Sequence, residues 1–191
     1  MSSNRPVWAE VDLGAIAGNM RRIRALLAPG VKFCPVIKAD AYGHGAVRVA
    51  GEAVKAGADY LAVALLQEAA ELREAGFRLP ILVLGYTPPE YAAEVVRNRV
   101  TQTVYRLEQV RALSAAAVEL GTEARIHLKV DTGMSRLGVP PADAAAFCQA
   151  AVTLPGITLD GVFTHFARAG DLGKSAAAAP FSAFRKALQA L

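Results

Sequence analysis

The chain has 191 residues, of which 53% are hydrophobic and 20% charged, and this composition excludes disorder as its general state. Its formal net charge is +4, but the basic residues are dispersed along the sequence. The densest basic group, Arg21, Arg22 and Arg24, falls on one predicted helix and has few aromatic residues around it. We therefore expect no nucleic-acid partner.

No part of the sequence predicts export or a membrane anchor. The first residues are polar, with no apolar signal segment after them. No apolar run approaches the ~20 residues that a membrane-spanning helix requires. Cys34 and Cys148 lie too far apart in the sequence for a metal or redox motif, and no metal site is expected. We expect a cytoplasmic protein without a membrane partner.

The amino-terminal part of the chain predicts a short strand, a helix and a second strand. Residues 5–11 are β-prone, and we take 1–11 as an N-terminal β segment and 12–191 as one domain. Asp12 is a suitable N-cap for a helix over 13–27, in which apolar residues recur with a period near 3.6. An apolar run at 31–37 predicts a buried strand.

Strands and helices then alternate to the last residue. Further strands are expected at 60–64, 80–84, 100–104, 125–130 and 157–164. Helices are expected at 44–56, after the strand at 60–64 to about Ala75, from Pro88 onward, at 107–120, at 140–152 and from near Pro180 to 191. Together with 31–37 this makes six strand-then-helix units, a rhythm typical of an α/β fold with a parallel sheet. The rhythm alone fits either a complete doubly wound sheet or three quarters of an eight-stranded (β/α)₈ barrel.

Polar residues gather where the predicted strands end, at the edge where βα folds bind ligands. They are Lys38, Asp40 and Tyr42 after the first strand of the units, Lys129, Asp131 and Arg136 after the fifth, and His165 after the sixth. Each has an ordinary alternative role. Lys38 could be a solvated strand end, Lys129 could pair with Asp131, and His165 could be a structural histidine. Only their joint placement favours an active site.

The stretch around Lys38 combines a lysine with a turn suited to phosphate. Gly43 and Gly45 permit close approach of the backbone, and the next helix offers its N-terminus to an anion. Tyr42 adds a neutral hydroxyl donor. Pyridoxal phosphate attaches to a lysine as an imine and stabilises carbanions, so this combination predicts pyridoxal phosphate as the cofactor. The two glycines without a third make a poor dinucleotide fingerprint.

Four blocks of the sequence resemble the alanine racemases, a family of pyridoxal-phosphate enzymes. They are WAEVDLGAIAGNMRRIR at 8–24, VIKADAYGHGA at 36–46, HLKVDTGMSRLGV at 127–139 and GVFTHFARAGD at 161–171. The resemblance implies a TIM-type (β/α)₈ barrel. This chain would hold about six units of it, and the family's C-terminal β domain would be absent.

The resemblance also implies roles for single residues. Lys38 would hold the cofactor and act as the base on one face of the substrate, and Tyr42 would donate a hydrogen bond to the cofactor phosphate. Leu84 would pack against the cofactor ring, and His165 would belong to the hydrogen-bond network behind that ring. Lys129 would be carbamylated and would position Arg136, which would bind the substrate carboxylate.

The implied reaction interconverts L-alanine and D-alanine, supplying D-alanine for peptidoglycan, and the family acts as a homodimer. The second base, a tyrosine, would come from the partner subunit's β domain, so we expect these 191 residues alone to be nearly inactive. The alternatives are a related pyridoxal-phosphate barrel enzyme, either a broader amino-acid racemase or a decarboxylase, and a non-catalytic pyridoxal-phosphate-binding barrel protein. The AEVDLGAIAGN opening favours the racemase over the non-catalytic protein.

Overall fold

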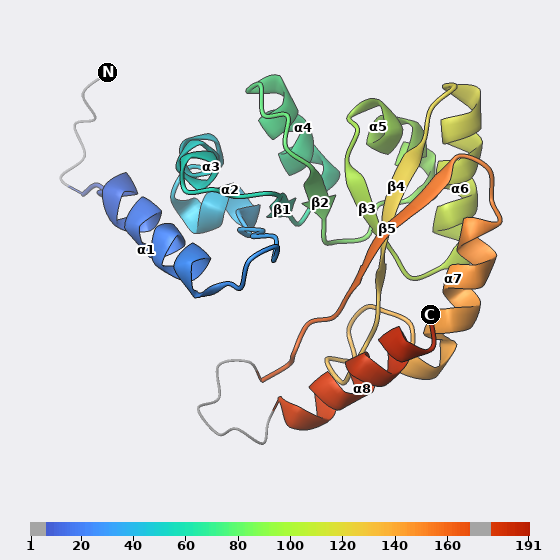
Figure 1. The fold of residues 1–191 in the computed structure, drawn as a ribbon. Helices are drawn as coiled ribbons and strands as arrows, with labels where there is room; N and C mark the ends of the chain where they lie inside the picture. Colours follow the sequence, from blue (N-terminus) through green and yellow to red (C-terminus); the bar gives the residue numbers. More distant parts are fainter. Residues whose placement is uncertain (1–6, 169–176) are drawn as a thin grey trace.

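A five-stranded parallel sheet forms the centre of the computed structural model, which describes residues 7–168 and 177–191 (Figure 1). Its strands are β1 (Leu61–Val63), β2 (Ile81–Val83), β3 (Thr101–Val104), β4 (Ala124–Lys129) and β5 (Ile157–Phe163). Neighbouring strands are always consecutive in the chain, in the order β1-β2-β3-β4-β5. A doubly wound sheet would reverse its order at a switch point, whereas a barrel wall adds each strand on the same side. The topology is therefore that of an incomplete TIM-type barrel, as the resemblance implied.

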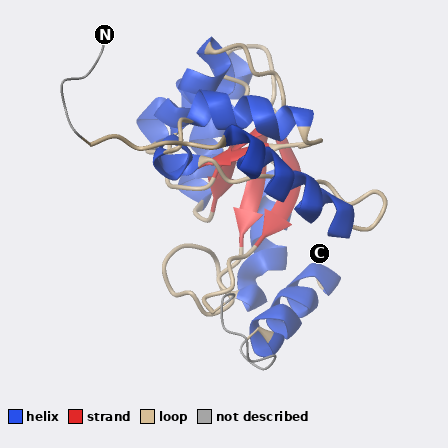
Figure 2. Cartoon of the chain, turned by 90° about the vertical axis from the view of Figure 1, so that its left-hand side faces the viewer, coloured by secondary structure: helices blue, strands red, loops and turns tan. Residues whose placement is uncertain are grey.

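Helices connect the strands (Figures 1 and 2). They are α1 (Leu13–Leu26), α2 (Lys38–Gly43), α3 (Ala46–Lys55), α4 (Leu66–Glu74), η1 (Pro89–Tyr91), α5 (Ala92–Arg97), α6 (Leu107–Glu119), η2 (Pro141–Asp143), α7 (Ala144–Val152) and α8 (Ala178–Gln189). Those that follow β1, β3 and β4, namely α4, α6 and α7, pack against the outer side of the sheet. The Asp12 carboxylate accepts the N–H of Ala15 at 2.9 Å and caps α1, as its place in the sequence predicted. None of the helices within the described ranges is long and apolar enough to cross a membrane.

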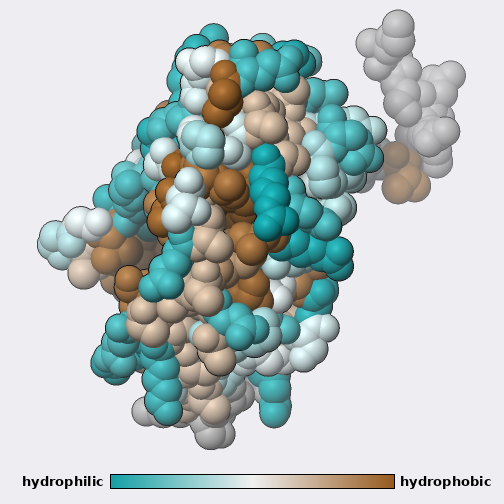
Figure 3. All heavy atoms as spheres, turned by 90° about the vertical axis from the view of Figure 1, so that its right-hand side faces the viewer, coloured by the Kyte–Doolittle hydropathy of each residue, from teal (hydrophilic) through white to brown (hydrophobic). Residues whose placement is uncertain are grey.

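The core lies between the strands and these helices. Leu61, Val63, Ile81, Val83 and Ile126 are completely buried. Because both faces of such strands are covered, their sequences are short apolar runs without strict alternation. The surface turned toward the viewer in Figure 3 carries both polar and apolar residues. Apolar residues run down it, and α6 and α7 on this side carry the exposed Val118 and Val152.

Residues 31–37 do not form the strand that their apolar run predicts. Val36 makes one isolated parallel bridge with Ala62, in which the N–H of Ile37 donates to the Ala62 carbonyl at 2.8 Å. In return, the N–H of Ala62 donates to the Pro35 carbonyl at 3.0 Å. Proline has no N–H to extend a ladder, so the pairing beside β1 is irregular before this point, where the Phe33 carbonyl accepts the N–H groups of Asp59 at 2.8 Å and Tyr60 at 3.2 Å.

The β-prone segment at the amino terminus does not form a strand over residues 7–11, and residues 1–6 lie outside the described part of the chain. Val7 is 81% exposed and Trp8 is 78% exposed. Strand propensity requires a partner strand to satisfy the backbone, and within the described ranges none lies beside this segment.

Candidate active site

A cavity of about 380 Å³ opens where the strands end at their carboxyl side. It is lined by Val36, Lys38, Ala64, Leu84, Gly85, Lys129, Arg136, Leu137, Phe163, Thr164 and His165. The cavity brings together five of the predicted residues, Lys38, Leu84, Lys129, Arg136 and His165, whereas Tyr42, which is 60% exposed, and the strand-end candidates Asp40 and Asp131 do not line it. The rule that ligands bind at the carboxyl ends of barrel strands correctly located this group.

Lys38 is held by an unusual backbone conformation. It is the first residue of α2, in which Ala39, Asp40, Ala41 and Tyr42 have φ between 52° and 56°. This is a left-handed turn, and for L-residues it costs roughly 1–2 kcal/mol per residue. The prediction that Lys38 ends a strand was therefore wrong in detail. The lysine follows an extended segment and opens a strained turn.

Two carboxylates hold this turn in place. Glu68 of α4 accepts the N–H of Ala39 at 2.6 Å through one oxygen and the N–H of Ala64, just after β1, at 2.7 Å through the other. Asp40 accepts the N–H of Ala46, the first residue of α3, at 2.6 Å. Hydrogen bonds to ionised groups are stronger than neutral ones, so the two carboxylates offset part of the backbone strain.

The Asp40 contact corrects one expectation. The first amide of α3, which was expected to face an anion, is already bonded to the Asp40 carboxylate. Gly43 and Gly45 have φ of 84° and 89°, a region in which side chains are strained, but a Cβ at either position would meet nothing within 4 Å, so close approach of the backbone there stays a prediction. The turn is therefore built around an internal anion, and the Ala46 N–H is not free for a phosphate.

Lys129, the last residue of β4, is buried, and no carboxylate of the described residues forms an ion pair with it. Its side chain is 4% exposed, and Nζ lies 5.6 Å from the centre of the Phe163 ring. Burial, followed by the charge of nearby Arg136, lowers the pKa of Lys129. No ion pair joins Lys129 to Asp131 within the described ranges, so the ordinary alternative of a strand-end ion pair is not found.

Asp131 instead organises the loop that carries Arg136. Its Oδ1 accepts the N–H groups of Gly133 and Ser135, each at 3.0 Å. Burial alone would raise the pKa of this carboxyl, but the N–H groups of Ser135, Gly133 and Met134 outweigh that effect and lower it. The base of the loop is closed by the Asp131 N–H donating to Val139 at 2.8 Å and the Val139 N–H donating to Lys129 at 2.9 Å.

The cavity is strongly cationic. Lys38, Lys129 and Arg136 all line it, and none of the described residues around it is a carboxylate. His165 is exposed at its edge, and burial, followed by the charges of Arg136, Lys129 and Lys38, lowers the pKa of its imidazole. The histidine is therefore favoured in its neutral form, while the remaining charge suits an anionic ligand such as a carboxylate or a phosphate.

Several lining residues were not singled out from the sequence. Gly85 lies so close to the end of β1 that a Cβ there would collide with the Ala64 carbonyl oxygen, and Thr164 shares a hydrogen bond of 2.8 Å with Thr132. Phe163 supplies the ring beneath Lys129. All three follow or end a strand, so strand-end position was the available signal, but nothing in their residue type suggested a site.

Comparison with known proteins shows which protein family this chain resembles. Residues 11–191 match the family model for the alanine racemase N-terminal domain. The alanine racemase of Desulfovibrio desulfuricans is 55% identical over 191 residues, which is 100% of this chain and 52% of that protein. An alanine racemase of Clostridium perfringens is 43% identical over 97% of this chain and 49% of its own length.

Solved structures agree with these relatives. An alanine racemase of Clostridium difficile 630 in complex with cycloserine superposes with a TM-score of 0.93 at 41% identity, covering 98% of this chain and 52% of that one. The alanine racemase of Bacillus anthracis with bound L-Ala-P gives a TM-score of 0.91 at 36% identity, covering 100% of this chain and 50% of that one. The chain thus spans about half the length of the proteins it matches, and it belongs to the alanine racemase family through that family's N-terminal, TIM-type barrel domain.

Proposed function

We propose that the cavity around Lys38 binds pyridoxal phosphate and that the protein interconverts L-alanine and D-alanine. The observation that carries this proposal is the meeting of Lys38, Lys129 and Arg136 in one cavity at the carboxyl ends of the strands. The family relation established above supports the choice of reaction.

The cavity fits such a cofactor in size and chemistry. A volume of about 380 Å³ lies within the usual range for small-molecule sites, roughly 300–1,000 Å³. The cationic lining suits the phosphate, and Leu84 offers an apolar surface for the ring. When bound, pyridoxal phosphate supplies an electron sink that acidifies the α-proton of an attached amino acid. We assign Tyr42 as a donor to the phosphate and His165 as a hydrogen-bonding neighbour of the cofactor.

Lys38 has two tasks in this proposal. Its Nζ is the point of covalent attachment for the cofactor, and after substrate binding the freed amine takes the α-proton from one face of alanine or returns it there. The left-handed turn fixes the Cα of Lys38 at the cavity wall, so that only the side chain has to move.

Arg136 would bind the substrate carboxylate, since a planar guanidinium matches a carboxylate better than an ammonium does. An unmodified Lys129 beside it would repel the same cation. We propose that Lys129 is carbamylated. Its neutral amine attacks carbon dioxide, an N–C bond forms, and one proton leaves to solvent. The product is an anion that attracts Arg136, and the lowered pKa of Lys129 favours the neutral amine that the reaction needs.

The remaining assignments follow the family. We propose alanine as the substrate, a homodimer as the working assembly, the cytoplasm as the location, and D-alanine supply for peptidoglycan as the role. The solved relatives were obtained with cycloserine and L-Ala-P, and both names support a small amino-acid-like ligand.

The test uses the protein expressed over its full natural reading frame. With pyridoxal phosphate, we expect a near-visible absorbance band that borohydride bleaches, and conversion of L-alanine to D-alanine followed by chiral chromatography. Lys38→Ala should lose the protein-linked band and the conversion, whereas the exposed-residue control Lys186→Ala should keep both. An unchanged band in Lys38→Ala would overturn the cofactor assignment. Release of carbon dioxide from an amino acid without racemisation would instead support a decarboxylase.

A further inference from the structure

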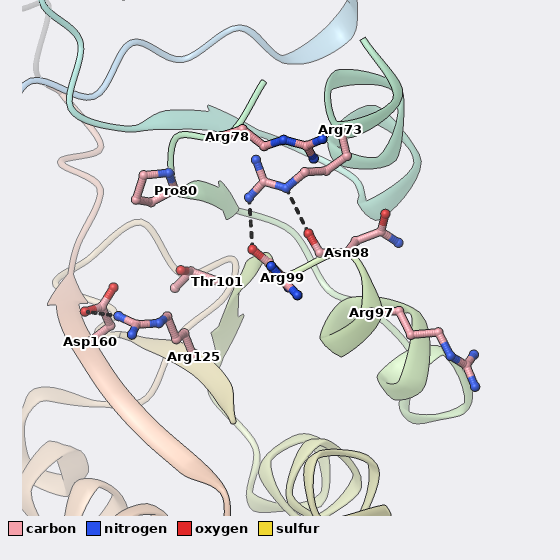
Figure 4. Close-up of a pocket in the computed structure, with 9 residues that line it drawn as sticks. All are labelled: Arg73, Arg78, Pro80, Arg97, Asn98, Arg99, Thr101, Arg125 and Asp160. Carbon is pink, nitrogen blue, oxygen red and sulfur yellow. Dashed lines mark hydrogen bonds and ion pairs between the residues drawn. The ribbon is translucent and has the colours of Figure 1, made fainter. Parts of the chain in front are cut away.

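A second and larger cavity, of about 620 Å³, lies at the opposite end of the sheet (Figure 4). Its walls come from the ends of α4 and α5, from the loops before β2 and β3, and from strands β3, β4 and β5. They comprise Arg73, Arg78, Pro80, Arg97, Asn98, Arg99, Thr101, Arg125 and Asp160. Five of these nine residues are arginines and one is a carboxylate. The alanine racemase reaction proposed above uses none of them.

Arg73 is locked into the wall of this arginine pocket by four hydrogen bonds to backbone carbonyls. It donates to Asn98 and Arg99, both at 2.9 Å, and to Phe77 and Leu79 at 3.0 and 2.8 Å. The backbone of Arg99 has φ of 49°, a left-handed conformation that turns its carbonyl toward Arg73. This guanidinium is thus held in place by carbonyl groups, and no carboxylate in the part of the chain that the structure describes pairs with it.

The other arginines gather around this fixed cation. Figure 4 shows the Arg78 side chain lying alongside Arg73. Burial, followed by the charges of Arg78 and Arg99, lowers the pKa of Arg73, so the three cations repel one another. Within residues 7–168 and 177–191, no ion pair or side-chain hydrogen bond neutralises Arg78 or Arg99. Arg125 is already paired, with Glu123 at 2.6 Å and Asp160 at 3.6 Å.

We propose that the arginine pocket is a binding site for a small phosphate-bearing molecule, held by Arg78 and Arg99 over the fixed Arg73. Forked guanidinium groups bind phosphate oxygens in a bidentate manner, and a multivalent anion would relieve the repulsion among these cations. Arg78 and Arg99 can each offer two N–H groups to separate phosphate groups, so the pocket suits a diphosphate or a larger phosphorylated molecule. Because it lies at the amino ends of the strands, it can be occupied together with the cavity around Lys38.

Pyrophosphate is the probe for this site. Isothermal titration is carried out on the full natural protein with saturating pyridoxal phosphate, so that the cavity around Lys38 is already filled. We expect one saturable site that weakens as ionic strength rises. The double variant Arg78→Ala/Arg99→Ala should bind at least tenfold more weakly. Arg111→Ala, which removes an exposed arginine of α6 outside the pocket, should bind as the unchanged protein does.

Arg73 is left unchanged because its backbone hydrogen bonds are structural. The variant Arg78→Lys/Arg99→Lys keeps the charge, and it should retain part of the affinity because an ammonium lacks the fork. The absence of saturable pyrophosphate binding to the unchanged protein would overturn the proposal. Equal binding by a folded Arg78→Ala/Arg99→Ala variant would do the same, as would binding of an acidic peptide but not of pyrophosphate.

Discussion

The carboxylate of Glu68 accepts the backbone N–H of Ala39 at 2.6 Å, one residue beyond Lys38. Its second oxygen accepts the N–H groups of Ala64 and Leu65 at 2.7 and 3.0 Å. One side chain therefore joins the left-handed turn of α2, the end of β1 and the start of α4. The position of Lys38 in the cavity thus depends on a residue from a different unit of the barrel.

Replacing Glu68 with glutamine should destabilise this junction. The amide has one acceptor oxygen, and its NH₂ group would face a backbone N–H, leaving a donor without a partner at a cost of roughly 1–3 kcal/mol. Urea unfolding followed by circular dichroism measures the loss. The control Glu71→Gln changes an exposed carboxylate on the same helix and should alter the free energy of unfolding by less than about 0.5 kcal/mol. Equal effects of the two substitutions would show that the junction contributes nothing.

Glycine should be tolerated unusually well at position 39. Ala39 is exposed and has φ of 52°, where a Cβ costs roughly 1–2 kcal/mol. Removing the Cβ offsets the extra chain entropy of glycine, about 0.5–1 kcal/mol. Ala39→Gly should therefore leave the protein equally stable or more stable by up to about 1.5 kcal/mol.

The matched control for that change is Ala115→Gly. Ala115 is exposed within α6, a right-handed helix, where glycine costs about 1 kcal/mol relative to alanine. Thermal unfolding of the two variants should give shifts of different sign or clearly different size. A similar loss at both positions would mean that the left-handed turn carries no strain.

How much of this site the sequence predicts depends on the range over which each signal acts. Strand-end position predicts that Lys38, Lys129, Arg136 and His165 meet at one cavity, because barrel topology orders strand ends before any side chain is placed, whereas Leu84 was implied only by the family resemblance. The Asp12 cap could also be predicted from the sequence, because the hydrogen bond to Ala15 spans only three residues. The hydrogen-bond partners of Glu68 could not be predicted, because the bond to Ala39 spans 29 positions and forms only in the tertiary fold.

Predictions from local sequence composition were wrong where the pairing of a segment with its neighbours in the fold determined its structure. Residues 31–37 have strand composition, but Pro35 and the position beside β1 limit them to one bridge. The left-handed run from Ala39 to Tyr42 has no sequence signature, since alanine and tyrosine normally avoid that region. The arginine pocket could not be predicted from the sequence either, because Arg73, Arg99 and Arg125 are far apart in the chain and meet only in the folded sheet.

Gly161 allows the His127 ring to lie inside the barrel wall. The two residues are partners in the β4–β5 register, and a Cβ at position 161 would come within 2.7 Å of the His127 Cε1 atom. Gly161→Ala should therefore destabilise the protein by about 1–3 kcal/mol, as overpacking typically does. Gly51→Ala in α3, where a Cβ meets nothing within 4 Å, should instead stabilise it by about 0.5–1 kcal/mol. Urea unfolding of both variants tests the prediction, and a stabilised Gly161→Ala would contradict it.

His127 should make stability depend on pH in a definite direction. Burial lowers the pKa of its imidazole from 6.5, only partly opposed by the Asp160 carboxylate, whose Oδ2 lies 3.8 Å from Nε2. The folded state therefore binds fewer protons than the unfolded state between its own pKa and about 6.5. The contribution of His127 to the free energy of unfolding is complete above the pKa of the unfolded state. It decreases as pH drops below about 7, by at most about 1.4 kcal/mol per pH unit.

The variant His127→Gln isolates that contribution. The pKa of exposed His165 is lowered as well, so His165→Gln has to be measured beside it. The free energy of unfolding in urea is measured from pH 5 to pH 8. Its dependence on pH should be steep for the unchanged protein and for His165→Gln, and flatter for His127→Gln. Because the comparison concerns slopes, any overall loss of stability from removing the ring does not affect it. If His127→Gln keeps the full slope, the pH dependence arises elsewhere and the folded protein accommodates a charged His127 beside Asp160.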